Sequence, residues 1–260
     1  MIPKIIHYVW LSNDKKPALI RKCIKSWRKK LPDWTIKCWN MTNSPKIDWV
    51  DEAIKSRKWA LAADYLRLYA LYHDGGVYLD SDVYITRNFS ELLDSSFFIP
   101  IEYNEGKYFG TGSDKKIDAT GARIEGMGLI EGLSAQAAIV GSENGNPVLL
   151  EMMDYYENNH FILPDGSLNY TYLAPDLMAT RLEKYGFKYK NETYELRNPV
   201  SNESVGKVYD TSYFASGLIS ADKNCYAIHM YSSTWKDYGF LENAKYKVKL
   251  FIKTFLLNFR

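Results

Sequence analysis

The sequence is poor in the residue types that mark several common functional classes. Its 260 residues include only three cysteines and four histidines, and the formal net charge is +2. Cys23, Cys38 and Cys225 are scattered without the spacing of a zinc site, and their odd number argues against a disulfide framework. Without a strong charge imbalance, a general nucleic-acid-binding surface is not expected. The apolar runs are also too short to span a membrane.

Aromatic residues are the abundant class, at 15% of the chain, with 21 Tyr and 7 Trp. Aromatic faces stack on sugars and bases, but they also fill protein cores, so both roles stay open. The composition is otherwise ordinary for a globular protein, and the length fits one domain. The segment Met1-Ile2-Pro3 leads directly into the first expected strand, so we expect no secretion signal. Together with the scattered cysteines, this favours a cytoplasmic protein.

Hydrophobic periodicity predicts alternating strands and helices in the first third of the chain. Runs rich in β-branched and aromatic residues predict strands, and segments with helical spacing predict helices. The expected strands are residues 4–10, 34–39 and 77–79, and the expected helices are residues 17–30, 48–57 and 59–72. This alternation predicts an α/β fold with a largely parallel sheet, which binds ligands at the carboxyl ends of its strands. Trp10 and Asp80 both follow such ends.

The helix expected at residues 59–72 carries one charged pair in an otherwise apolar sequence. Asp64 and Arg67 are three residues apart, so they share a helix face. Gly75 and Gly76 then end the helix, since glycine suits the left-handed conformation found at helix ends. Such a pair is either a structural ion pair or part of a polar ligand pocket.

Two further carboxylates follow the short strand at residues 77–79. Asp80 and Asp82 are two residues apart, so in an extended chain they point to the same side. A lone Asp-x-Asp is also compatible with a solvated strand end. However, two close carboxylates repel each other unless a cation neutralises them, and oxygen ligands suit Mg²⁺ or Mn²⁺. Together with the nearby charged pair, they indicate a metal site beside a polar pocket.

The middle of the chain is expected to be less regular. Residues 103–132 contain seven of the sixteen glycines, which predicts a long loop. Such a loop would either shape the acceptor side or close over the donor. Residues 133–140 are expected to form one strand, and residues 147–156 a helix that begins with proline.

The central segment resembles glycosyltransferase family 32. The shared pattern is an alanine-rich start, then Asp-x-x-Arg, then Gly-Gly-x-Tyr-x-Asp-x-Asp. This chain carries it at Ala62, Ala63, Asp64, Arg67, Gly75, Gly76, Tyr78, Asp80 and Asp82. Relatives of that family include bacterial capsule and lipopolysaccharide sugar transferases, fungal initiating mannosyltransferases and, more distantly, clostridial glucosylating toxins. The resemblance implies a GT-A fold, with a Rossmann-like nucleotide-binding half, a mixed sheet and an irregular acceptor-side region.

The resemblance also implies roles for residues outside the central segment. Trp10 becomes a candidate contact for the nucleotide base, and Gln136 occupies the family's polar position in the strand expected there. Near the end of the chain, His229 becomes a third metal or phosphate ligand. Thr234 and Trp235 stand where relatives have Ser-Trp beside the diphosphate. An imidazole together with carboxylates favours Mn²⁺ over Mg²⁺.

The activity implied by the resemblance is that of a retaining, metal-dependent glycosyltransferase. Asp80 and Asp82 would hold a cation that neutralises the departing diphosphate, while Asp64 and Arg67 would position the donor sugar. The expected donor is a nucleotide-diphosphate hexose, with UDP favoured over GDP. The expected acceptor is an oligosaccharide or lipid-linked saccharide in bacterial capsule or lipopolysaccharide synthesis. A toxin-like or effector-like protein glycosyltransferase and a non-catalytic carbohydrate-binding protein remain alternatives.

The C-terminal end is a separate predicted element. We expect a GT-A domain over residues 1–240 and a basic amphipathic helix over residues 241–260. No acidic residue follows Glu242, and the basic residues there are Lys245, Lys247, Lys249, Lys253 and Arg260. Such a helix can lie on an anionic membrane, here the inner face of the plasma membrane, or pack against its own domain.

Overall fold

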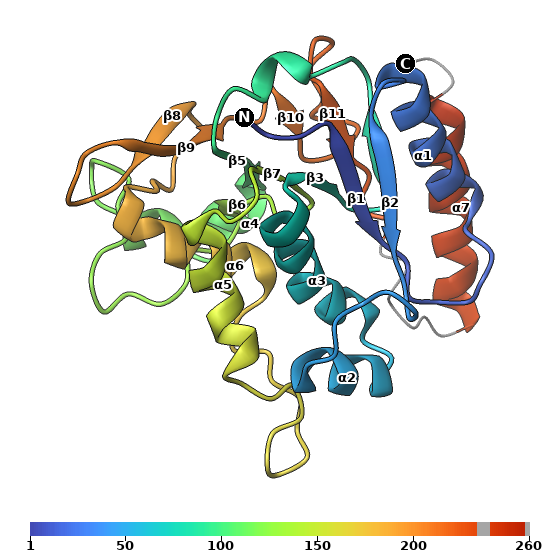
Figure 1. The fold of residues 1–260 in the computed structure, drawn as a ribbon, viewed down its shortest axis with the longest axis horizontal. Coiled ribbons are helices and arrows are strands. Elements are labelled where there is room, and N and C mark those ends of the chain that lie inside the picture. The colour runs from blue at the N-terminus through green and yellow to red at the C-terminus, as the bar shows by residue number, and fades with distance from the viewer. Residues whose placement is uncertain (233–239, 258–260) are drawn as a thin grey trace.

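A mixed eight-stranded sheet forms the centre of the molecule, and a three-stranded sheet lies beside it (Figure 1). The structure, a computed structural model, describes residues 1–232 and 240–257. The large sheet has the order β2-β1-β3-β7-β5-β9-β8, with β6 paired to β5, and the small sheet has the order β10-β11-β4. The strands are β1 (Ile5–Val9), β2 (Thr35–Trp39), β3 (Gly76–Leu79), β4 (Val83–Ile85), β5 (Phe97–Tyr103), β6 (Leu133–Ala135), β7 (Ile139–Ser142), β8 (Tyr194–Arg197), β9 (Ser204–Tyr209), β10 (Phe214–Ala215) and β11 (Ala227–His229).

The N-terminal strands give the large sheet its parallel half. β2, β1 and β3 are neighbours and run parallel. Beyond β3, strand β7 pairs antiparallel with both β3 and β5, and β9 runs parallel to β5. The expected α/β architecture, a Rossmann-like half continued by a mixed sheet, is therefore confirmed. Because β1 and β3 are adjacent and parallel, their carboxyl ends lie at the same edge of the sheet.

Helices cover both faces of the sheet. They are α1 (Ala18–Lys30), α2 (Asp48–Lys55), α3 (Trp59–Asp74), α4 (Glu105–Gly110), α5 (Pro147–Glu157), α6 (Ala174–Leu182) and α7 (Phe240–Leu256), with 3₁₀ turns at Ser90–Leu92, Ser113–Lys116 and Glu183–Tyr185. One apolar cluster joins the sheet to α2, α3, α5 and α6 around Trp49 and Phe161. A second cluster packs α1 against β1, β3 and β4 around Trp27 and Phe89.

Two glycines and a histidine fix the turn between α3 and β3. Gly75 and Gly76 have φ values of 64° and 113°, which side chains with a Cβ rarely adopt. His7 on β1 contacts the Gly75 carbonyl through Nε2 at 2.8 Å, and the indole of Trp39 donates to His7 Nδ1 at 3.1 Å. Burial lowers the pKa of His7, so the neutral ring has both nitrogens engaged. His7 is thus a structural residue that ties β1 to the end of α3.

Two segments differ from their predicted structure. Residues 103–132 do not form one long loop, because the Asn104 side chain caps α4 by accepting from the Lys107 N–H, and a 3₁₀ turn follows. Residues 133–140 form two strands, because the chain leaves its pairing with β5 after Ala135. Between β6 and β7, the carbonyls of Ala137 and Ala138 instead accept hydrogen bonds from Arg67 of α3 and from the Asp80 N–H after β3.

The C-terminal helix α7 lies beside α1 at the edge of the molecule (Figure 1). Leu250 of α7, and Leu257 just after the helix, pack in a cluster with Leu19 and Cys23 of α1. Lys22 of α1 also donates to the carbonyl of Thr254 at 2.8 Å. Among the described residues, no helix is long and apolar enough to cross a membrane. The division of the chain at residue 240 stays a prediction.

We predict that Gly76→Ala lowers the free energy of unfolding by about 2–4 kcal/mol, because it combines a strained φ with a clash. A Cβ on Gly76 would lie 2.5 Å from the backbone oxygen of Ile5, which cannot move without disturbing the β1–β3 pairing. Urea denaturation would measure the loss. Gly128→Ala is the control, since nothing lies within 4 Å of its Cβ position. Equal stability of the two variants would contradict this account.

Candidate functional site

Asp80 and Asp82 lie on a tight turn that carries the chain from the large sheet to the small one. The Val83 N–H donates to the Asp80 carbonyl at 2.9 Å, and the Asp80 N–H donates to Ala138 at 2.9 Å. The expectation that the two aspartates lie in extended chain is therefore wrong. The turn arises because β3 ends at Leu79 in one sheet and β4 begins at Val83 in the other.

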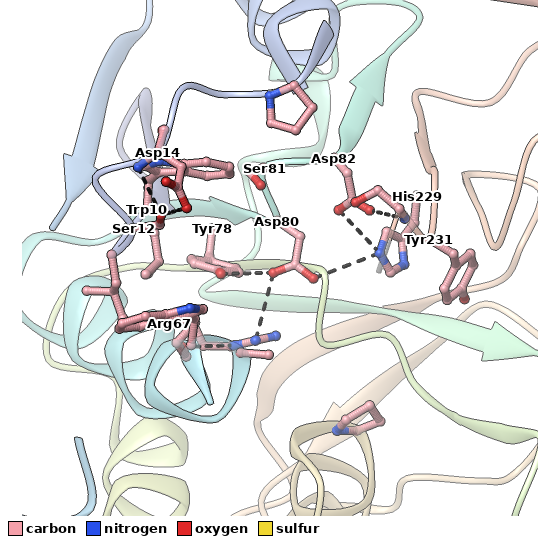
Figure 2. Close-up of a pocket in the computed structure, with 18 of the residues that line it drawn as sticks. Trp10, Ser12, Asp14, Arg67, Tyr78, Asp80, Ser81, Asp82, His229 and Tyr231 are labelled. Carbon is pink, nitrogen blue, oxygen red and sulfur yellow. Dashed lines mark hydrogen bonds and ion pairs between the residues drawn. The ribbon is translucent and has the colours of Figure 1, made fainter. Parts of the chain in front are cut away.

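The turn and the small sheet bring His229 to the two aspartates. His229 is the last residue of β11 and pairs with Val83 of β4. Its Nε2 atom lies 3.5 Å from Oδ1 of Asp82 and 3.9 Å from Oδ2 of Asp80 (Figure 2). One ligand atom from each of the three residues falls within 4.8 Å of the others. Two carboxylates and one imidazole nitrogen form a donor set that fits a divalent metal ion.

Charges within this group are strongly coupled. Burial alone would raise the pKa of Asp82, but His229 and a hydrogen bond from the Ser232 N–H lower it below its ordinary value. That N–H lies 2.6 Å from Asp82 Oδ2. Burial opposes protonation of His229, but Asp82 and Asp80 raise its pKa above 6.5. Asp82 is therefore ionised at neutral pH and ready to ligate a cation.

Asp64 and Arg67 form a buried ion pair on α3. Nη2 of Arg67 lies 2.6 Å from Oδ1 of Asp64, and their side chains are 5% and 10% exposed. Nη1 of Arg67 donates to the Ala137 carbonyl at 2.6 Å. The N–H of Ala174, at the start of α6, donates to Asp64. Burial raises the pKa of Asp64 to about 6, although Arg67 and the Ala174 N–H oppose the rise.

Tyr78 links the ion pair to the candidate metal ligands. Its hydroxyl donates to Asp80 Oδ1 at 2.9 Å, and the Arg67 guanidinium lies 4.8 Å from the centre of its ring. Arg67 Nη2 is itself 3.8 Å from Asp80 Oδ1. Figure 2 shows Asp80 between Tyr78 and Arg67 on one side and His229 on the other. The two charged groups that the sequence separates therefore form one continuous site.

Two cavities meet at this site. The larger, of ≈ 530 Å³, is lined by Trp10 at the end of β1 and by the Asp80–Asp82 turn, and it reaches Tyr231. The smaller, of ≈ 200 Å³, is lined by Asp64, by Ala137 and Ala138 between β6 and β7, and by the start of α6. Their shared lining residues are Ala60, Arg67, Asp80, Glu102, Pro175 and His229. A ligand in one cavity would thus be next to a ligand in the other.

Six of the predicted site residues line these cavities: Trp10, Asp64, Arg67, Asp80, Asp82 and His229. Gln136 lines neither cavity. Its Nε2 donates to Ser216 at 3.1 Å, and its buried Oε1 has no hydrogen-bond partner within the described part of the chain. Thr234 and Trp235 lie outside the described residues.

Sequence reasoning missed three residues of the site. Tyr78 precedes Asp80 by two residues, and Tyr231 follows His229 by two, so each lay within a motif that could have drawn attention to it. The ring centres of Tyr231 and His229 are 3.9 Å apart. Glu102 lies near the end of β5 and gave no signal in the sequence. Only the pairing of β5 within the sheet brings it to the lining that the two cavities share.

Comparison with known proteins agrees with this geometry. Residues 17–99, which include the ion pair and the Asp80–Asp82 turn, match the family "Glycosyltransferase sugar-binding region containing DXD motif". The chain is a glycosyltransferase with a DXD metal site. This glycosyltransferase is 23% identical, over 252 residues, to a protein of Acanthamoeba polyphaga mimivirus described as an uncharacterized glycosyltransferase; the alignment covers 90% of this chain and 84% of that protein.

Several solved structures are also similar to this glycosyltransferase. The PaToxG glycosyltransferase is 17% identical with a TM-score of 0.48, and the match covers 70% of this chain and 69% of that one. A glycosyltransferase involved in glycosylation of the major capsid of PBCV-1 is 11% identical with a TM-score of 0.47, at 96% and 100% coverage. The galactosyltransferase LgtC, in complex with donor and acceptor sugar analogs, is 14% identical with a TM-score of 0.44, at 95% coverage of both chains.

We predict that Asp82→Asn weakens Mn²⁺ binding at least about tenfold, because it removes a ligand charge but keeps an oxygen that can accept from the Ser232 N–H. Isothermal titration calorimetry with Mn²⁺ alone would measure the affinity. Asp51→Asn, an exposed change on α2, is the charge-matched control. Equal Mn²⁺ affinity in the Asp82 and Asp51 variants would rule out Asp82 as a ligand.

Proposed function

We propose that this glycosyltransferase moves a hexose from a UDP-hexose to a saccharide acceptor with retention of anomeric configuration, giving an α-linkage. The observation that carries the proposal is the position of three different groups on the wall of one cavity. Trp10 lies at the end of β1, Arg67 projects from α3, and Asp80, Asp82 and His229 converge between them. A base-stacking ring, a guanidinium and a candidate metal site are the groups that a nucleotide-diphosphate sugar requires.

The metal ligands in this proposal are Asp80, Asp82 and His229, and the proposed ion is Mn²⁺. The imidazole nitrogen favours Mn²⁺ over Mg²⁺, which prefers an all-oxygen shell. When bound, the cation neutralises charge on the departing diphosphate. Tyr78 and Arg67 support this by holding Asp80 in place beside the site.

The ion pair on α3 would position the donor sugar. Asp64 lines the smaller cavity and can accept from sugar hydroxyls, while Arg67 lines both cavities. A guanidinium has five N–H groups, so its bonds to Ala63, Asp64 and Ala137 leave donors for the sugar or the phosphate. Rigid placement of this kind lowers the barrier by orienting the reacting bond. Gln136, Thr234 and Trp235 stay predicted donor contacts.

The acceptor would enter through the smaller cavity. Ala137 and Ala138 form part of its lining, and Tyr170 and Leu173 line it with 52% and 46% of their surface exposed. An exposed tyrosine ring in a largely apolar cavity suits stacking on a sugar. In this proposal the acceptor hydroxyl attacks on the face from which the diphosphate leaves, and the leaving phosphate takes its proton.

The proposed setting is bacterial capsule or lipopolysaccharide synthesis on the inner face of the plasma membrane. The acceptor would then be an oligosaccharide or a lipid-linked saccharide. A toxin-like enzyme would instead modify a protein. Both use the same donor chemistry, so the acceptor is the point at which the two differ.

We predict that the wild type releases free nucleotide from one UDP-hexose in the presence of Mn²⁺, and that EDTA or Asp82→Asn reduces the rate at least about 100-fold, because the charge on the leaving diphosphate is then uncompensated. Nucleotide release would be quantified for a panel of UDP- and GDP-sugars. Asp51→Asn again serves as the charge-matched control.

Three outcomes of this assay differ in meaning. Metal-dependent release from a GDP-sugar alone would correct the choice of base. No release, with metal-dependent UDP binding intact, would indicate a strict acceptor requirement. Sugar binding that needs neither nucleotide nor metal would overturn the proposal.

The outer face of α7 supports the proposed membrane contact. Val248, Phe251, Ile252 and Phe255 have the i, i+3, i+4, i+7 spacing of one helix face, and each is about half exposed or more, with Phe251 at 71%. Leu250 packs on the opposite side against α1. The stripe therefore remains exposed after α7 has docked on its own domain.

Basic side chains surround this apolar stripe. Lys245 and Lys249 are exposed on α7, and α1 beside it carries no acidic residue. The exposed basic residues of α1 are Arg21, Lys25, Arg28 and Lys29. An apolar stripe within a positive surface matches an anionic lipid bilayer, which takes up the aromatic rings and attracts the lysines. We therefore assign an anionic membrane surface to this face.

We predict that replacing both Phe251 and Phe255 with Ser lowers binding to phosphatidylglycerol-containing vesicles at least about tenfold, because two aromatic rings no longer enter the bilayer. Vesicle pelleting would measure the bound fraction. Ile219→Ser is the control, because Ile219 is fully exposed and lies outside α7. Equal loss in the control, or equal binding to neutral phosphatidylcholine vesicles, would contradict the assignment.

A further inference from the structure

The inner face of α7 contacts the segment that follows His229. Lys253 donates from Nζ to the carbonyls of Met230 and Tyr231, with 3.1 Å to the latter. The side chain is half-buried, and burial lowers its pKa. An ammonium group has three N–H donors, so it can bind two carbonyl oxygens at once. Without it, both carbonyls would lose a charged partner near the protein interior.

The same segment holds Asp82 from the other side. The Met230 N–H donates to the Asp82 carbonyl at 3.1 Å, and the Ser232 N–H donates to Asp82 Oδ2 at 2.6 Å. Between these two N–H groups the backbone leaves the extended conformation of β11. Tyr231 makes a turn there with a φ of 45°, a value that non-glycine residues seldom adopt. Such a conformation persists only where its surroundings enforce it.

The turn also sets the surroundings of His229. The ring of Tyr231 lies against the imidazole, with 3.9 Å between ring centres, and both residues line the larger cavity. A change at residues 230–232 would therefore displace two of the three candidate metal ligands. Lys253 binds the two carbonyls that flank the strained residue, so it lies where it can enforce the turn.

We infer that Lys253 is a positioning residue for the metal site. It acts through residues 230–232, which in turn orient Asp82 and His229, and it touches neither the donor nor the metal. The inference rests on the proposed metal and donor site. It gives the C-terminal helix a function inside the enzyme that is separate from its exposed face. Lys22 supports it by holding the adjacent Thr254 carbonyl of α7 to α1.

Three variants of the full chain test this inference. Lys253→Met removes the ammonium group but keeps a long apolar side chain, and Lys253→Arg keeps a charged donor. Lys247→Met removes one exposed positive charge from the same helix and serves as the control. The affinity for Mn²⁺, with and without UDP, would be measured by calorimetry on protein shown by near-ultraviolet circular dichroism to be folded. We expect Lys253→Met to weaken Mn²⁺ binding at least about fivefold, with Lys253→Arg and Lys247→Met within about twofold of the wild type.

A metal-free measurement separates this inference from the proposed function. Amide hydrogen exchange of residues 226–232 should become faster in Lys253→Met and stay unchanged in Lys247→Met, while exchange in β1 stays constant. Folded Lys253→Met with wild-type Mn²⁺ affinity and unchanged exchange would overturn the inference. A wild type that binds no Mn²⁺ would overturn the proposed metal site instead, and the exchange measurement alone would then decide whether Lys253 holds the segment.

Discussion

The buried ion pair between Asp64 and Arg67 is the constraint on which the site depends. Charges removed from water are costly unless each polar atom finds a partner. Apart from the Ala63 carbonyl, the partners here come from outside α3: the Ala137 carbonyl, the Ala174 N–H and, at 3.8 Å, Asp80. The buried pair therefore depends on the interruption between β6 and β7, on the start of α6 and on the end of β3. The need to give the buried Asp64–Arg67 pair its polar partners therefore also brings the residues of the candidate site together.

The second constraint is the passage of the chain between two sheets. β3 ends in the large sheet and β4 begins in the small one, so the intervening residues turn at the edge where β1 also ends. Strand β11 pairs with β4 and delivers His229 to that turn. A metal site between two sheets fixes their relative position, and a bound cation would stabilise the folded state by linkage.

The sequence predicted the parallel half of the fold and most of the site because the information there is local. From α3 to the Asp80–Asp82 turn, apolar periodicity, two glycines and the charged residues Asp64, Arg67, Asp80 and Asp82 lie in one continuous stretch. The break between β6 and β7 could not be predicted in this way. Residues 133–140 are uniformly compatible with a strand, and the interruption is imposed by Arg67 and by the N–H of Asp80, which bind the carbonyls of Ala137 and Ala138.

Glu102 was missed for a similar reason, since its position depends on the pairing of β5. The Asp80–Asp82 turn was mistaken for extended chain because periodicity cannot distinguish a strand that continues from one that changes sheets.

The C-terminal helix shows that two alternatives offered by a sequence need not exclude each other. Membrane contact and packing against the domain appeared to compete, because one apolar face was expected to serve one partner. The helix has two apolar faces: Leu250 faces α1, while Phe251 and Phe255 face outward. Because Lys253 on the inner side also holds the segment beside Asp82, any force that shifts α7 acts on the candidate metal ligands. Linkage is reciprocal, so a lipid surface that favours the docked helix would favour the ordered site, and a bound cation would favour the docked helix by the same factor.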